Sequence, residues 1–216
     1  MIQIHKILSA GIVVALVAAL AVTQVGSESA TATHTPANKV SVSGAALEVM
    51  TTDVTEGSVS DVHTILKGKL RSSGPTDLIL QVTAECALWT YVTTVGNAES
   101  EAIASVKVWV EIDGVPVTVA GDDTGEEAGK VVFCNRAYRM ETLQFDDEDA
   151  TIKQYLKTRS ANAFNWVSLN VGSGVHEITV KAQLEGSVSG TGMAKAAIGK
   201  RTLVVEPTKL ANDVTI

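Results

Sequence analysis

Two cysteines are the residues whose chemistry this sequence specifies most clearly. Cys86 and Cys134 are the only cysteines among its 216 residues. In an exported protein such a pair usually forms a disulfide, and closing the loop between them would stabilise the fold by roughly 4 kcal/mol. Two separate buried thiols are the alternative. A metal site is disfavoured, because two cysteines without a nearby histidine do not supply four ligands. We therefore expect a disulfide, no metal and no cofactor.

Three aromatic side chains form the second candidate site. The alternation of apolar and polar residues places Trp89 and Tyr91 on the strand face opposite Cys86, and Trp109 on the outward face of its own strand. If the two strands are neighbours, the three rings share one sheet face. An exposed aromatic platform stacks on sugar rings or on a protein partner. The competing expectation, which we favour, is that a helix near residues 146–160 covers them.

The remaining reactive residues match no catalytic or metal-binding pattern. Acidic residues gather at 122–127 and 146–149 without the spacing of a calcium loop. His63 is expected on a charged strand face and His176 at the start of a strand, and no Gly-x-Ser-x-Gly motif supports a Ser–His–Asp arrangement. The glycine-rich turns lack the Lys-Ser/Thr of a phosphate-binding loop. The sequence assigns no catalytic residue and favours a non-enzymatic protein over an enzyme.

The N-terminal segment predicts export. Residues 1–6 contain Lys6 and no acid, residues 7–22 are uncharged, and a Ser/Thr/Ala-rich stretch follows. These are the three parts of a secretory signal. We expect residues 1–25 to be a signal peptide or an N-terminal membrane anchor. The alternatives stay open because the apolar run falls just short of the ~20 residues of a spanning helix. Residues 26–40 are expected to be a flexible linker, and the domain is expected outside the cell or on its surface.

The composition limits the class of partner. The net charge is −7, which disfavours nucleic acid because an acidic surface repels phosphates. Contact with a membrane is expected only through residues 7–25, if that segment is not cleaved. The 216 residues are enough for one domain with its own hydrophobic core, and 45% hydrophobic residues is within the range of a soluble globular protein. An unidentified protein or a glycan is the expected partner.

The candidate cysteines and aromatic residues lie in segments where apolar and polar residues alternate, which predicts strands. The clearest strand is DLILQVTAEC, in which apolar side chains at even positions lead to Cys86. Asp113-Gly114 between two such runs predicts a hairpin turn, and Pro116 places the second arm at a sheet edge. Eight to ten short strands predict an all-β fold, an antiparallel two-sheet β-sandwich (Ig-like or jelly-roll-like), over residues 41–206. Residues 207–216 are expected to be a C-terminal tail.

One segment departs from the strand pattern. Residues 146–160 begin with acids, end with bases, and carry Ile152, Tyr155 and Leu156 at spacings of three and four. These features predict one short amphipathic helix. The order Cys86, Trp109, Cys134 resembles that of immunoglobulin domains, where a core tryptophan packs on an inter-sheet disulfide. Since the alternation points Trp109 away from that core, we expect a sandwich with an internal disulfide without assigning that family.

The sequence thus predicts a secreted or surface-tethered non-enzymatic β-sandwich that serves in binding, adhesion or as a structural surface module. Two alternatives remain open. One is a secreted hydrolase with an unrecognised site. The other is a surface subunit that self-assembles through exposed edge strands.

Overall fold

The computed structural model describes most of the chain beyond residue 40. The described ranges are 41–45, 48–50, 59–95, 98–119, 124–141 and 151–210. The predicted signal or anchor at 1–25, the linker at 26–40 and the acidic clusters at 122–123 and 146–149 lie outside them. Within the described ranges, no helix is long and apolar enough to span a membrane.

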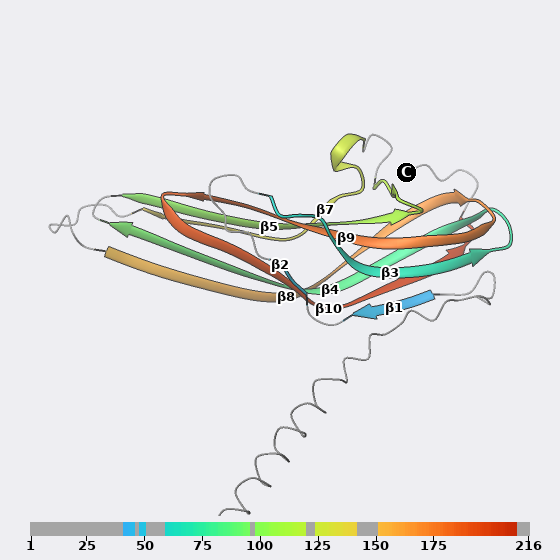
Figure 1. Cartoon of the computed structure of the whole chain (residues 1–216), viewed down its shortest axis with the longest axis horizontal. Helices are drawn as coiled ribbons and strands as arrows, with labels where there is room; N and C mark the ends of the chain where they lie inside the picture. Colours follow the sequence, from blue (N-terminus) through green and yellow to red (C-terminus); the bar gives the residue numbers. More distant parts are fainter. Residues whose placement is uncertain are drawn as a thin grey trace, which may run out of the picture. The chain divides into compact units, whose positions relative to one another are not determined.

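The described residues form two antiparallel sheets (Figure 1). The sheet that contains β4, here the β4 sheet, has the order β1-β10-β4-β8, with β2 beside β10. The β5 sheet has the order β3-β9-β5-β6, with β7 also beside β5. The strands of the β4 sheet are β1 (Ser41–Ala45), β2 (Glu48–Met50), β4 (Thr76–Val95), β8 (Thr151–Val171) and β10 (Thr191–Thr208). Those of the β5 sheet are β3 (His63–Ser72), β5 (Glu99–Ile112), β6 (Val115–Pro116), β7 (Val131–Glu141) and β9 (Gly174–Ser189).

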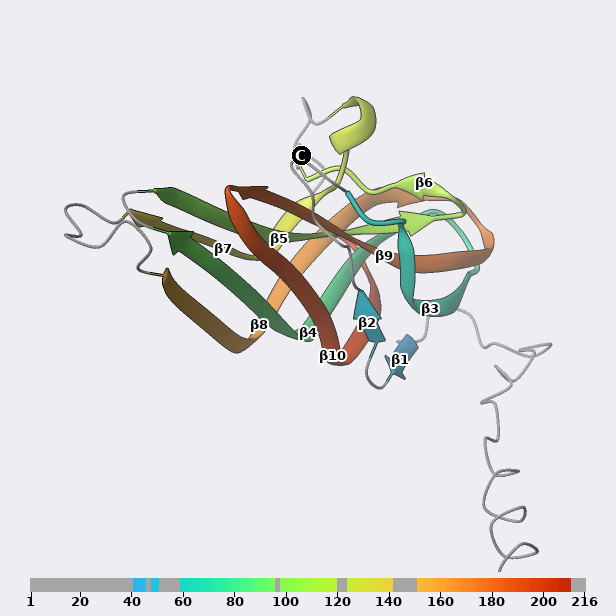
Figure 2. The same cartoon turned by 60° about the vertical axis from the view of Figure 1, so that its left-hand side comes forward.

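The two sheets lie face to face, as Figures 1 and 2 both show. The predicted antiparallel β-sandwich is therefore confirmed, and ten strands fall within the described ranges. The last strand, β10, continues through Pro207 and Thr208, which pair with Leu78 and Asp77 of β4.

The core lies between the sheets and follows from the period of two. Every even position of β4 from Leu78 to Thr94 is buried, whereas most odd positions are partly exposed. The facing strands β5 and β9 contribute small and branched side chains such as Val106 and Val180, both fully buried. Trp166 of β8 is also fully buried, and its Nε1–H donates to the Gly129 carbonyl at 2.9 Å. A buried indole needs such a partner, so this bond ties β8 to the segment before β7.

The disulfide between Cys86 and Cys134 joins the two sheets, with 6.5 Å between the Cα atoms. Cys86 lies in β4 and Cys134 in β7, so the bond crosses the core rather than linking neighbours in one sheet. It closes a loop of 48 residues. The expected cross-link is thus present and fixes β4 against the opposite sheet.

The predicted helix at 146–160 is wrong where the structure describes it, because residues 151–160 belong to β8. In β8 the side chains of Ile152 and Leu156 are half-buried and that of Tyr155 is exposed. A spacing of four suits a strand face as well as a helix face, so Ile152 and Leu156 fit both patterns. The segment forms a strand because β8 pairs with β4 from Thr151 to Val171. This tertiary contact overrides the weak helix propensity of residues 151–160. The one helical element among the described residues is a 3₁₀ turn, η1 (Gly125–Glu127).

The predicted hairpin at Asp113-Gly114 is confirmed. Both residues have positive φ, 53° and 83°, as a two-residue hairpin turn requires.

The Asp113 carboxylate accepts a hydrogen bond from His176 Nδ1 at 2.7 Å, and the other nitrogen of His176 lies 2.9 Å from the Gly172 carbonyl. Because both partners are acceptors, this arrangement favours the protonated imidazolium form of the ring. The hydrogen bond to Asp113 raises the pKa of His176.

Candidate functional site

The candidate site is a hollow of about 400 Å³ on the outer face of the β4 sheet. We call it the Trp89 hollow. Three neighbouring strands, β10, β4 and β8, supply its lining, and their register places the residues in rows across the sheet. Ala197, Ala87 and Arg159 form one row, and Trp89 and Lys157 belong to the next. The lining residues are Glu85, Ala87, Trp89, Lys157, Arg159, Ala197 and Gly199.

Small side chains make the floor of the hollow. Ala87 and Ala197 are direct partners on β4 and β10, and Gly199 follows where β10 bulges between Ile198 and Arg201. A Cβ on Gly199 would lie 2.7 Å from a carboxylate oxygen and 3.0 Å from the Cβ of Glu85, so a larger residue would displace the Glu85 side chain. The larger Trp89 beside them forms a wall.

Arg201 supports the bulge from inside the sandwich. Its side chain is buried at 7% exposure, and its Nε–H donates to the Ile65 carbonyl of β3 at 2.7 Å. Nη1 lies 3.3 Å from the Gly199 carbonyl. A β-bulge leaves some backbone carbonyls without a partner on the neighbouring strand. Both β10 and β3 have such an irregularity beside the carbonyls that Arg201 contacts. Arg201 therefore links the two sheets and holds the floor of the hollow in place.

An ion pair borders the floor. The Arg159 guanidinium donates to a carboxylate oxygen of Glu85. This hydrogen bond holds the pKa of Glu85 below its usual range, against the opposing effect of burial, with help from the backbone of Lys200. Glu85 is thus an ionised acceptor at neutral pH, and Arg159 is a fixed donor. Such a pair suits hydrogen bonding to a polar ligand.

The wall of the hollow is Trp89 with lysines on both sides. Lys157 of β8 and Lys195 of β10 are its register partners. The Lys157 ammonium lies 5.1 Å from the centre of the indole ring, within the range of a cation–π contact. One step along β4, Tyr91 lies between Met193 and Tyr155, and Tyr155 is 55% exposed. Trp89 and Tyr91 are thus the first two of a group of large side chains that extends along β4 away from the hollow and includes Met193 and Tyr155.

The structure separates Trp109 from the other two aromatic residues. Trp109 does point away from the core, but β5 belongs to the opposite sheet, so Trp109 lies on the other outer face. It is only 5% exposed. The Lys130 ammonium lies 5.2 Å from the centre of its ring, and Glu127 of η1 binds both Lys130 and Lys107. The segment with η1 thus covers the Trp109 face, in place of the expected helix, and Figure 1 shows the turn on the outer side of that sheet.

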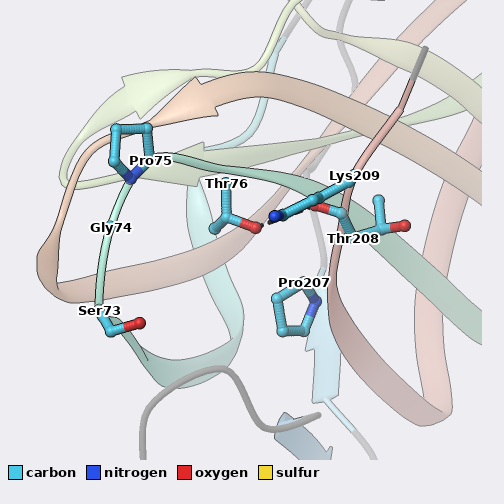
Figure 3. A pocket seen from close by; sticks show the side chains of 7 residues that line it. All are labelled: Ser73, Gly74, Pro75, Thr76, Pro207, Thr208 and Lys209. Atoms are coloured by element: carbon cyan, nitrogen blue, oxygen red, sulfur yellow. Dashed lines mark hydrogen bonds between the residues drawn. The ribbon is translucent and has the colours of Figure 1, made fainter.

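Two further hollows lack comparable chemistry. One, of about 370 Å³, lies where β4 begins and β10 ends (Figure 3). There the Thr76 hydroxyl donates to the Thr208 carbonyl, and no aromatic residue lines the space. The other, also about 370 Å³, lies between the β5–β6 hairpin and β8 and is lined largely by aliphatic side chains such as Val117 and Leu169. Among the described residues no group of His, Cys, Asp or Glu could hold a metal ion.

Sequence reasoning placed Trp89 and Tyr91 on an outward face but missed the residues that turn that face into a hollow. Arg159 and Lys157 were assigned to a helix, which hid their pairing with β4. The signal for the floor was Gly199, because a glycine inside a strand pattern indicates a bulge or a close approach.

Comparison with known proteins adds little. No family model and no curated protein matches the sequence. Among solved structures, TmCBM61 in complex with beta-1,4-galactotriose is 12% identical, with a TM-score of 0.15, over 79% of this chain and 88% of that one. The CBM22-1 xylan-binding domain from Paenibacillus barcinonensis Xyn10C is 10% identical, with a TM-score of 0.16, over 81% and 98%. At these TM-scores the likeness carries no argument about this chain.

Proposed function

We propose that this protein is a non-enzymatic carbohydrate-binding domain that binds a saccharide at the Trp89 hollow. The observation that carries the proposal is the combination of lining residues. An indole wall stands beside a floor of alanine and glycine, and the Glu85–Arg159 pair borders it. A sugar ring has an apolar face that packs on an aromatic ring and hydroxyl groups that need both donors and acceptors. The hollow offers an aromatic ring in Trp89, a donor in Arg159 and an acceptor in Glu85. Small-molecule sites likewise combine apolar walls with a few polar groups.

The same residues favour binding over hydrolysis. Glycosidases use two carboxyl groups about 5–9.5 Å apart, one of them held protonated by a raised pKa. Glu85 is the only carboxylate among the lining residues, and its pKa is lowered. The hydrolase alternative therefore has no support from this site.

The edge strand β8 gives no support to the self-assembly alternative. β8 ends the β4 sheet and presents Lys153, Lys157 and Arg159 on its outward face, all of them exposed. A second copy added at this edge would bring like charges together. Cations on an edge strand are a known defence against such pairing.

Export remains part of the proposal. The disulfide supports an oxidising compartment, as an extracellular or cell-surface protein would experience. Residues 1–25 would supply the export signal or the anchor, which fits a domain that meets polysaccharides outside the cell.

A screen of the purified protein against immobilised polysaccharides tests the proposal, with Trp89→Ala as the diagnostic variant. We expect binding to at least one saccharide and a loss of at least ~10-fold in affinity for the variant, because the stacking surface is removed. Val132→Ala is a suitable control, since Val132 is an exposed residue of the other sheet. Equal binding by Trp89→Ala and the wild type would refute the site.

A further inference from the structure

Three basic side chains lie around Trp89. Lys157 and Lys195 lie on either side of Trp89 in the register, and Arg159 is the next outward residue on β8. The one carboxylate in the lining, Glu85, is already bonded to Arg159. Within the described ranges, no ion pair joins Lys157 or Lys195 to a carboxylate.

Two lysines on the opposite face of the sandwich have acidic partners. On the outer face of the β5 sheet, Lys107 binds Glu127 and Glu185, and Lys181 lies 3.8 Å from Glu111, whereas Lys67 and Lys69 of β3 are exposed. The chain as a whole carries a net charge of −7. The Trp89 hollow thus combines an aromatic wall with two flanking lysines, in a protein that is acidic overall. Such a surface attracts an anionic ligand, whereas the acidic remainder of the protein surface repels it.

We infer that the saccharide recognised at the Trp89 hollow is anionic and carries carboxylate or sulfate groups. This inference rests on the proposed function and names the class of ligand. The sugar ring packs against Trp89 while its anionic group lies between Lys157 and Lys195, or beside Arg159. The ammonium groups of the two lysines bind either anion, because both anions accept charge-assisted hydrogen bonds.

Two matched pairs of polymers test the inference. The first pair is polygalacturonate and its fully methyl-esterified form, and the second is a sulfated galactan and its unsulfated parent. Each pair keeps the sugar ring and changes the charge. We expect at least one charged polymer to bind, with its neutral counterpart at least ~10-fold weaker, and we expect the difference to shrink at high salt.

A double variant separates local charge from net charge. Lys157→Gln/Lys195→Gln is expected to lose at least ~10-fold in affinity for the charged polymer. Lys67→Gln/Lys69→Gln is the control, because it removes the same charge from exposed positions of β3 in the other sheet. Equal losses in both variants would overturn the inference, since they would report net charge alone.

The remaining outcomes are also decisive. Binding to neutral saccharides as strong as binding to charged ones overturns the inference and leaves the proposed function standing. Binding to polyglutamate as strong as binding to the charged polysaccharide overturns it as well, because the site would then recognise any polyanion. If no saccharide of either kind binds, the proposed function and the inference both fail.

Discussion

Removal of the inter-sheet disulfide should destabilise the sandwich by a calculable amount. The variant Cys86→Ala/Cys134→Ala leaves both strands in place and opens the covalent loop of 48 residues. In the chain-entropy model, a loop of this length contributes about 4 kcal/mol to the free energy of unfolding at 25 °C. Because domains of this size are stable by only about 5–15 kcal/mol, the loss would be a large share of the total.

The expected shift in melting temperature follows from the size of the domain. A loss of 1 kcal/mol lowers Tm by roughly 2–4 °C for 150–250 residues, so the double variant should melt about 8–16 °C lower. Cys86 is only 2% exposed, and its replacement by alanine also removes a buried sulfur, which adds to the loss.

Calorimetry and urea unfolding would measure the effect on the oxidised protein, the reduced protein and the double variant. Val132→Ala provides the control, because Val132 is 56% exposed and lies in β7 two residues before Cys134. The reasoning is refuted if reduction changes the free energy of unfolding by less than about 1 kcal/mol, a value far below the loop estimate.

Three further predictions concern residues around the site and the hairpins. Gly199→Val should weaken saccharide binding by at least ~10-fold in isothermal titration, because its Cβ would lie 2.7 Å from Glu85; unchanged affinity would contradict the description of the floor. Arg201→Met should lower the free energy of urea unfolding by about 3 kcal/mol, since buried carbonyls lose a charged donor; a loss below about 1 kcal/mol would contradict its role. His176→Gln should abolish a pH-dependent part of stability of up to about 1 kcal/mol. That stabilisation is fully present below the pKa of about 6.5 that histidine has in the unfolded chain, and it is lost as the pH rises through the raised pKa of the folded state. If the free energy of unfolding of variant and wild type depends on pH in the same way, the bond to Asp113 is excluded.

The sequence was sufficient to predict the sandwich because its strands alternate in polarity. In β4 the period of two runs without interruption from Leu78 to Thr94, so the buried face and the position of Cys86 follow directly. The Asp113-Gly114 turn was equally clear, because its backbone conformation restricts the residues that it accepts.

The hollow could not be predicted because it depends on which strands become neighbours. Trp89, Lys157 and Gly199 come from three strands far apart in the sequence, and only the pairing of β4 with β8 and β10 brings them together. The error at 146–160 had the same origin. The spacing of Ile152 and Leu156 fits the periods of helix and strand alike, and pairing with β4 makes the segment a strand.

Tryptophan fluorescence tests the central claim, that a saccharide binds at the Trp89 hollow, most directly. The chain has three tryptophans, of which Trp109 is 5% and Trp166 0% exposed, so a bound ligand reaches Trp89 alone. We expect titration with the bound saccharide to change the emission of the wild type and to leave that of Trp89→Phe unchanged. A full change that persists in Trp89→Phe would place the ligand elsewhere and contradict the account.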